Sequence, residues 1–432
     1  MYKKLLFSPL LLLFFLSASL HAATFFVDNS GSPACSDSAG NGSATNPWCT
    51  INYGLSHISG GDTLNVKAGT YREDVYISGP AGTAANPTTI QAYQGQTVTI
   101  LGAGVNSGRV KIVNTSYITF RGFTISNFNQ GLFVETADHI TISNCIVYNI
   151  GQEAIHVHAG SSFVTIDTCT VHDAGVWAFD GEGIYIGTGD SSPLDNTNHV
   201  VVKNCTIFNT TDEGIELKIG THDVTIDGNL IYNANTVDNG YGGAAIEVNQ
   251  AVGSFQHWDS NPNHIIRNNK IHNVGPGTGA ADLNSGIRAG TGGAYYNNLI
   301  WNINALGAGI FVDNQSSDSY TRKIYHNTID LPGSRAVILN AGTVDIRNNI
   351  GPATPNNIAT SSAYYVNKSG ADYHLAAGSA PINAGADLTS IVATDIDGTS
   401  RLTNSSPDLG AYEYVNGGSR PAPPTNLTVI VH

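Results

Sequence analysis

A four-residue strand pattern decides the fold of this chain, and it is repeated eight times between residues 131 and 339. The copies are Gly131-Leu132-Phe133-Val134, Ala154-Ile155-His156-Val157, Gly183-Ile184-Tyr185-Ile186, Gly214-Ile215-Glu216-Leu217, Ala245-Ile246-Glu247-Val248, Gly286-Ile287-Arg288-Ala289, Gly309-Ile310-Phe311-Val312 and Ala336-Val337-Ile338-Leu339. In every copy the third residue varies and its two neighbours are apolar. Because side chains alternate across a strand, we expect the neighbours to face a core and the third residue to face outward. The copies begin 23 to 41 residues apart, which fits one coil plus surface loops of variable length.

A second repeated feature follows each strand pattern. It is a residue pair whose second member is Cys three times and then Asn five times: Asn144-Cys145, Thr168-Cys169, Asn204-Cys205, Gly228-Asn229, Asn268-Asn269, Asn297-Asn298, His326-Asn327 and Asn348-Asn349. Asparagines stacked from coil to coil form hydrogen-bonded ladders, a feature of parallel stacked coils. The two repeats together predict an all-β protein with a single-stranded, right-handed parallel β-helix, a solenoid over about residues 60–370.

The chain begins with features typical of a secreted protein. Residues 1–22 are predicted to be a signal peptide, with Lys3-Lys4 before an apolar stretch and Ala22 at the expected cleavage point. Cys35 and Cys49 are expected to pair in an oxidising compartment, whereas the three cysteines of the repeat are expected to pack. Later in the sequence no apolar stretch is long enough to predict a membrane span.

Four segments of the mature chain are distinguished by their patterns. An N-terminal cap, carried by Trp48 to Gly69, is expected to cover the end of the coil stack. We assign residues 23–370 to the β-helix and this cap, 371–415 to an irregular C-terminal cap, and 416–432 to a linker-like tail.

The charge balance restricts the class of partner. The whole chain has a net charge of −14; without the two Lys of the signal peptide the count is 17 − 33 = −16. Nucleic-acid binding is disfavoured, because no basic stripe can release phosphate counterions. A polyanionic glycan would be repelled unless cations intervene. We expect the chain to be a monomer.

The third residues of the eight strand patterns form a predicted outward column. It comprises Phe133, His156, Tyr185, Glu216, Glu247, Arg288, Phe311 and Ile338. Two residues further along the same face come Glu135, His158, Gly187, Lys218, Asn249, Gly290, Asp313 and Asn340. Acidic, basic and aromatic types gather on the middle coils, which predicts a functional surface. Substrate contacts are expected from His158, Asn249 and Glu247.

Stacked acids on this face predict a cation site. Adjacent coils lie about 4.8 Å apart, so Glu216 would face Glu247, and Glu182 would face Glu213. Carboxylates at that spacing do not both ionise without a proton or a cation between them. Oxygen ligands suit a hard cation, and we expect Ca²⁺. The expected ligands are Asp180, Glu182, Asp212, Glu213 and Glu216. The alternative is an acidic rim that is only solvated.

The basic and aromatic residues of the face are the candidates for catalysis. A pKa lowered by a bound dication and by Arg288 would make Lys218 a base; otherwise Lys218 neutralises the acidic patch. Arg288 either clamps a substrate carboxylate or is a surface residue. His156 and Tyr185 would transfer a proton or contact a sugar ring, or else only pack.

These motifs resemble those of the β-helical polysaccharide lyases that act on uronic acids. The similar N-terminal stretches are Asn46-Pro47-Trp48-Cys49-Thr50-Ile51, Gly61-Asp62-Thr63-Leu64 and Gly69-Thr70-Tyr71-Arg72-Glu73. Asp212-Glu213-Gly214-Ile215-Glu216 is similar to the Asp-Asp-Gly-x-Asp calcium site of family-nine pectate lyases, with Glu in place of two Asp. Lys218 close behind it and Arg288 on a later coil resemble the family-six alginate and chondroitin lyases. Neither spacing is fully matched, so the resemblance implies a mechanism type and leaves the exact family open.

The resemblance implies a secreted lyase that cleaves a uronic-acid-containing polysaccharide by calcium-assisted β-elimination. Ca²⁺ held by the acids would neutralise the uronate carboxylate, and Lys218 would take the C5 proton. Arg288, Tyr185 or His156 would assist the carboxylate or the leaving oxygen. A glycoside hydrolase using two carboxylates, an epimerase and a non-catalytic glycan-binding surface protein stay open as alternatives.

Overall fold

The computed structural model describes ten stretches of the chain. They are residues 22–177, 181–189, 194–237, 243–250, 262–275, 284–304, 306–313, 319–352, 354–402 and 406–416, with only the backbone described at 249 and 250. The predicted signal peptide and tail lie outside the described residues except at their boundary positions, and Asp180 lies outside them too. The domain boundaries at 370 and 415 stay predictions.

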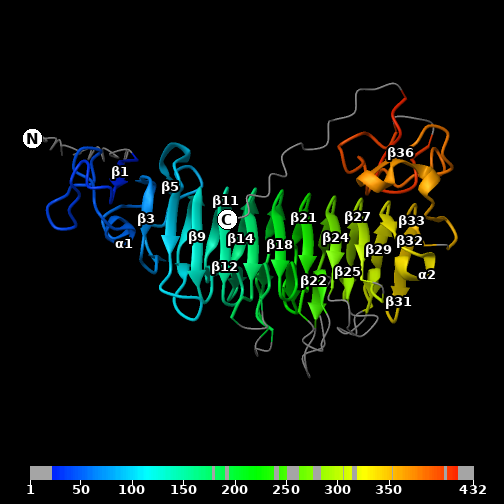
Figure 1. The fold of residues 1–432 in the computed structure, drawn as a ribbon, viewed down its shortest axis with the longest axis horizontal. Helices are drawn as coiled ribbons and strands as arrows, with labels where there is room; N and C mark the ends of the chain where they lie inside the picture. The colour runs from blue at the N-terminus through cyan, green and yellow to red at the C-terminus, as the bar shows by residue number, and fades with distance from the viewer. Residues whose placement is uncertain are drawn as a thin grey trace, which may run out of the picture.

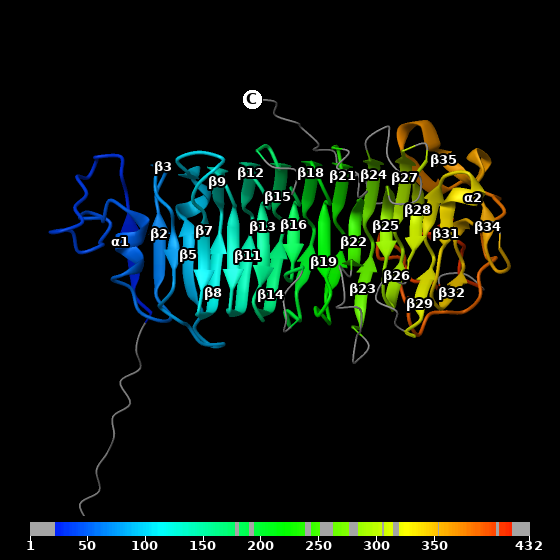
Figure 2. The ribbon, with the colours of Figure 1, turned by 90° about the horizontal axis from the view of Figure 1, so that it is seen from below.

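Three parallel sheets run along an elongated coil, and successive turns of the chain add strands to each of them (Figure 1). Sheet 1 contains β1 (Thr24–Val27), β2 (Thr63–Val66), β5 (Thr88–Ala92), β8 (Ser116–Arg121), β11 (Asp138–Ser143), β14 (Ser162–Asp167), β17 (Val201–Lys203), β20 (Thr225–Asp227), β23 (His264–Arg267), β26 (Gly293–Tyr296), β29 (Arg322–Tyr325) and β32 (Val344–Arg347). Sheet 2 contains β4 (Tyr76–Ile77), β7 (Val110–Val113), β10 (Leu132–Glu135), β13 (Ile155–His158), β16 (Ile184–Ile186), β19 (Ile215–Lys218), β22 (Ala244–Gln250), β25 (Ser285–Ala289), β28 (Ala308–Val312) and β31 (Val337–Leu339). Sheet 3 contains β3 (Gly69–Tyr71), β6 (Val98–Leu101), β9 (Phe123–Phe128), β12 (Ile146–Ile150), β15 (Thr170–Ala174), β18 (Thr206–Thr210), β21 (Leu230–Ala234), β24 (Lys270–Val274), β27 (Leu299–Ile303), β30 (Thr328–Asp330), β33 (Ile350–Gly351) and β34 (Ile358–Ala359). The predicted all-β solenoid is confirmed, and the strands of sheet 2 are seen side by side in Figure 2.

The interior of the coil is filled by the apolar half of each strand. In β19, Ile215 and Leu217 have no exposed surface, and they align with equally buried residues of β16 and β22. Burying an aliphatic side chain of this size stabilises the fold by roughly 1.5–3 kcal/mol. The period-two alternation therefore fixes which residues of sheet 2 point away from the core.

The paired-residue repeat forms the sharp turn between sheets 1 and 3. The first residue of all eight pairs has a left-handed backbone, with φ between 51° and 70°, a conformation that Asn and Gly adopt at low cost. The second residue faces inward, and the predicted ladder is confirmed by side-chain amide bonds of 2.8–3.0 Å. They join Asn229 to Asn269, Asn269 to Asn298, Asn298 to Asn327, Asn327 to Asn349 and Asn349 to Asn357. The last rung, Asn357, lies beyond the predicted repeat.

The N-terminal end carries the predicted cap. Its helix α1 (Ile51–Leu55) begins at Thr50, whose side chain accepts a hydrogen bond from the Tyr53 amide. The predicted disulfide joins Cys35 to Cys49. The Trp48 ring is buried and stacks on Phe25 with ring centroids 5.2 Å apart.

The C-terminal segment packs on the flank of the last coils (Figure 1). Its antiparallel pair is β35 (Tyr365–Asn367) and β36 (Asp372–Leu375). The buried Arg401 guanidinium donates to Glu413 at 2.8 Å and to the Asn297 side chain at 2.6 Å, which ties the segment to the ladder turn. The remaining short helices are α2 (Gly333–Ala336), η1 (Tyr93–Gly95), η2 (Ser362–Tyr364) and η3 (Lys368–Gly370). Across the described ranges, every helix is too short or too polar to cross a membrane.

Candidate active site

Sheet 2 carries the predicted column in the predicted order. Its Cα partners, one from each strand from β10 to β31, are Phe133, His156, Tyr185, Glu216, Glu247, Arg288, Phe311 and Ile338. The register shifts once, after Leu217, so Lys218 aligns with Gln250 and not with Asn249 as equal spacing predicts. The Asn249 side chain lies outside the described residues, and its role in substrate binding stays a prediction.

The column differs from a solvated strand face in its burial. Glu216, Glu247 and Arg288 are 1%, 0% and 2% exposed. Because neighbouring strands are only about 4.8 Å apart, long side chains on adjacent coils cover one another. Buried charges require partners, so the ion pairs of this column determine its chemistry.

Three buried carboxylates meet where β16 and β19 begin. Glu182, Asp212 and Glu213 each place an oxygen within 4.8 Å of the others. Burial, followed by the charge of Glu216, raises the pKa of Glu182 well above its usual range. Burial and the charge of Asp212 do the same to the pKa of Glu213. One oxygen of Glu182 is buried and has no hydrogen-bond partner within the described part of the chain.

This cluster fits a hard divalent cation. Its donors are all carboxylate oxygens, the ligand type that Ca²⁺ takes in proteins. A cation would also supply the charge and the coordination that the buried Glu182 oxygen lacks. Three of the five expected ligands are thus brought together, while Glu216 turns to Lys218 and Asp180 is outside the described residues.

Lys218 and Glu216 form a tight ion pair on one strand. The Lys218 Nζ contacts Glu216 Oε1 directly and lies 5.3 Å from the centre of the Tyr185 ring. Burial works to lower the pKa of Lys218, but the neighbouring groups, led by the Glu216 carboxylate, together outweigh it and raise that pKa well above its usual range. Burial raises the pKa of Glu216 to about 7, against the opposing charge of Lys218. The lowered pKa expected for Lys218 depended on a bound dication and on Arg288, and the protein's own groups together act in the opposite direction.

Arg288 is held between two carboxylates. Its Nη1 donates to Glu247 Oε1 at 3.1 Å and its Nη2 donates to Asp313 Oδ2 at 2.9 Å. Two N–H groups are used in this way, which leaves three of the five guanidinium donors for other partners. Arg288 is therefore a positioned cation in the column and not a free surface residue.

The tautomer of His156 follows from its contacts. Its Nε2 lies 2.8 Å from the Gly187 carbonyl oxygen, so Nε2 carries the proton and donates it. Burial lowers the pKa of His156 to about 3, which keeps the ring neutral. Its Nδ1 is then a buried acceptor, for which the described residues supply no donor. The ring stacks on His158, with centroids 4.3 Å apart.

Two features of the site were not singled out from the sequence. Asp313 was expected on the same face, two residues beyond Phe311, but its pairing with Arg288 was not predicted. Asp195 accepts hydrogen bonds from the Ala159 and Gly160 amides at 2.8 and 3.0 Å and so fixes the chain next to His158. Asp195 lies in an insertion between two copies of the repeat, where the periodicity gives no signal.

The comparisons with known proteins agree with this architecture. Residues 31–249 match the family described as Pel9A-like, right handed beta helix region. No curated protein matches the chain. The similar solved structures include the pectate lyase Pel9A, with a TM-score of 0.64 and 17% identity over 90% of this chain and 96% of that one. A rhamnogalacturonan lyase gives a TM-score of 0.58 and 13% identity over 80% and 91%. The alginate lyase from Paenibacillus sp. strain FPU-7 gives 0.55 and 16% over 78% and 99%. At these identities the structural likeness concerns the fold.

Proposed function

The chain belongs to the family of Pel9A-like, right-handed β-helix proteins, and on that basis we propose that it is a secreted polysaccharide lyase that cleaves a uronic-acid-containing chain by calcium-assisted β-elimination. The observation that carries the proposal is the buried cluster of Glu182, Asp212 and Glu213 next to the Lys218–Glu216 pair. The disulfide of the N-terminal cap supports an extracellular or periplasmic location.

Calcium binding is assigned to the three clustered carboxylates. Bound there, Ca²⁺ supplies positive charge that neutralises a uronate carboxylate and acidifies its C5 proton. In the proposed site this charge also offsets the acidic surface that would otherwise repel an anionic substrate. Glu216 and Asp180 complete the proposed ligand set as further oxygen donors.

Lys218 is proposed as the base of the elimination. Its Nζ takes the C5 proton, the released electron pair forms the C4–C5 double bond, and the C4–O bond breaks. Glu216 holds Lys218 in place, and the neutral amine that this step requires would come from the charge of a bound dication, which would lower the pKa of Lys218. The leaving oxygen takes a proton from Tyr185, whose pKa is raised mainly by burial, so that its hydroxyl stays protonated.

The other residues of the column are assigned to substrate binding. Arg288 offers its remaining N–H groups to the substrate carboxylate, with Glu247 and Asp313 fixing its orientation. His156 accepts a hydrogen bond from a sugar hydroxyl through Nδ1, and His158 and Asn249 are proposed as further substrate contacts. Because Nδ1 of His156 carries no proton, Tyr185 is the better proton donor.

Ultraviolet absorbance of the unsaturated product tests this proposal. The purified protein is mixed with pectate, alginate and glycosaminoglycan chains, with Ca²⁺ and with a chelator. We expect an absorbance rise with one of these polymers that chelation and Lys218→Ala both abolish. Release of reducing ends without the absorbance rise, retained in Lys218→Ala, would contradict the proposal and favour hydrolysis by paired carboxylates.

A further inference from the structure

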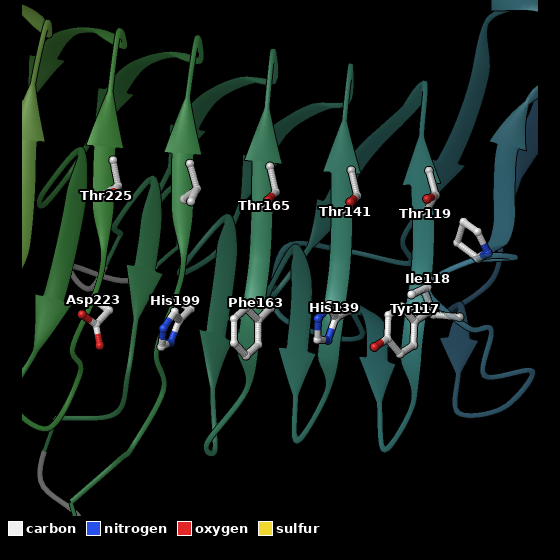
Figure 3. Close-up of a pocket in the computed structure, with 13 residues that line it drawn as sticks. Tyr117, Ile118, Thr119, His139, Thr141, Phe163, Thr165, His199, Asp223 and Thr225 are labelled. Carbon is white, nitrogen blue, oxygen red and sulfur yellow. The ribbon is translucent and has the colours of Figure 1, made fainter.

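A second group of metal-ligand residues lies on sheet 1, on a different face of the β-helix from the column of sheet 2. His199 precedes β17, and His222 and Asp223 precede β20 on the next coil. Each of the three places a ligand atom within 4.8 Å of the others. Figure 3 shows His199 and Asp223 side by side at one end of a row that continues through Phe163 and His139.

The backbone holds two of these residues in equivalent places on successive coils. His199 and Asp223 both have a left-handed backbone, with φ of 51° and 54°. Their coils are linked by a bridge between Asn198 and His222. The β-helix repeat therefore presets the spacing of the three side chains before any ligand binds.

Each of the three residues also has a hydrogen bond to an asparagine side chain that orients it. His199 Nδ1 lies 2.7 Å from Asn198 Oδ1, and Asn198 Nδ2 donates to a backbone carbonyl oxygen, which fixes that amide. The Nδ1 of His199 must then carry the proton, so its Nε2 is left as the acceptor. Asp223 Oδ1 accepts from Asn263 Nδ2 at 2.8 Å, which leaves Oδ2 directed toward His222.

His222 lies between two oxygen acceptors. Its Nδ1 is 2.8 Å from Asp223 Oδ2 and its Nε2 is 3.2 Å from Asn196 Oδ1. A neutral imidazole has one N–H and satisfies only one of these contacts. With a cation at Nδ1 and at Asp223 Oδ2, the Nε2–H would donate to Asn196, and every atom would have a suitable partner.

From this arrangement we propose that His199, His222 and Asp223 bind a divalent transition-metal ion of the zinc class. Two imidazoles and one carboxylate form a zinc-type donor set, unlike the all-oxygen cluster of sheet 2. The amides of Asn198, Asn196 and Asn263 occupy the outer-shell positions that orient metal ligands in proteins. The site is independent of the lyase function proposed above.

The site opens onto a shallow groove of about 620 Å³. His199 and Asp223 line one end of it, and the row of Tyr117, His139 and Phe163 continues along it (Figure 3). Three protein ligands would leave a further position of a zinc-class ion for water or another donor.

Zinc titration calorimetry on the full chain tests the proposal, with excess Ca²⁺ present to occupy the oxygen cluster of sheet 2. We expect one zinc ion per chain, lost in His199→Ala and in His222→Ala. Asn263→Ala should weaken binding by roughly 10–100-fold, the usual effect of removing an outer-shell partner. His139→Ala is the matched control: it removes an imidazole from the same row that is paired with Asp138 and stacked between Tyr117 and Phe163, and it should leave binding unchanged.

Cobalt substitution gives a second readout. The Co²⁺ spectrum of the wild type should lack a thiolate charge-transfer band, which would be present if the buried cysteines held the ion. Zinc binding of equal affinity in wild type, His199→Ala and His222→Ala would overturn the proposal. So would the absence of zinc binding in folded wild-type protein.

Discussion

Two stacks of polar side chains run along the same coil and meet opposite requirements. In the ladder of Asn229, Asn269, Asn298, Asn327, Asn349 and Asn357, each inner amide accepts from the rung before it and donates to the next. In the acidic part of sheet 2, carboxylates repeat at the same spacing, but an ionised carboxylate only accepts hydrogen bonds. The amide stack is satisfied by the protein alone, whereas the acid stack requires a proton, a lysine or arginine, or a cation. We infer that the first stabilises the fold and the second provides the chemistry.

The largest effect is expected from removing Lys218, the proposed proton acceptor that is paired with the acid stack. Lys218→Ala removes the group proposed to take the C5 proton, and general-base groups typically contribute about 10²–10⁴-fold in rate. The measurement is kcat by ultraviolet absorbance on the identified polymer, with thermal unfolding to show that the variant is folded. A variant that keeps more than a tenth of the wild-type rate would remove Lys218 from the mechanism.

Breaking the amide stack should instead cost stability. Asn298→Ala removes bonds to Asn269, Asn327 and the Ile266 carbonyl oxygen and leaves buried donors without acceptors. At about 1–3 kcal/mol for each unsatisfied group, we expect a loss of about 3 kcal/mol in the free energy of unfolding, with the rate at low temperature unchanged. Asn357→Ala, at the half-buried last rung, is the matched control and should lose much less. Equal losses in the two variants would contradict the ladder as a source of stability.

The pH dependence of the free energy of unfolding distinguishes the two stacks, because the carboxylates titrate and the amides do not. Glu182, Glu213 and Glu216 have raised pKa values, so they bind protons more tightly in the folded state than in the unfolded state. The stability they contribute is complete below the usual glutamate value of 4.5 and is lost as pH rises through the pKa of Glu216, about 7. In calcium-free buffer, wild type should therefore lose more stability between pH 5 and pH 8 than Glu182→Gln does.

Added calcium should reverse that loss in wild type. At about 100 times its dissociation constant, a ligand that binds only the folded state stabilises by about 2.7 kcal/mol. Chemical unfolding at both pH values, with and without Ca²⁺, measures the effect. If the free energy of unfolding changed with pH in the same way in wild type and in Glu182→Gln, the clustered acids would not be the cause of the stability lost at high pH.

The smallest effect is expected where the ladder changes from asparagine to cysteine. The Cys205 amide already donates to Asn229 Oδ1 at 2.9 Å, as the amide of an Asn rung would. Cys205→Asn extends the ladder by one rung and should change the free energy of unfolding by less than about 1 kcal/mol, near the value of a single net hydrogen bond. A large destabilisation would mean that the coil is too narrow for an amide at this position.

The sequence was sufficient for the fold because every coil repeats the same physical requirement. Ile215 and Leu217 flank Glu216 as Ile184 and Ile186 flank Tyr185, and that alternation determined the register of sheet 2. The Asn and Cys positions likewise identified the turn between sheets 1 and 3. The shift after Leu217 and the added rung at Asn357 were missed because each departs from the repeat. The strands β4 and β7 of sheet 2 were missed as well, because they precede the first copy of the pattern.

The site was less predictable because it depends on how side chains turn within the column. The strand register predicted that Glu216 lies next to Glu247. It did not predict that Glu216 pairs with Lys218 or that Glu247 pairs with Arg288. The burial of the column also followed from stacking and not from the pattern. Asp195 and the group around His222 lie in turns and insertions, where a strand period carries no information.

Calcium titration calorimetry of the wild type, Glu213→Gln and Asn298→Ala tests the contrast between the two stacks most directly. We expect the wild type and Asn298→Ala to bind Ca²⁺ alike, because the amide ladder serves stability alone. Glu213→Gln should bind much more weakly, because it removes one of the three clustered carboxylates. Calcium binding of equal strength in all three proteins, or in none, would contradict the assignment of the acid stack as a cation site.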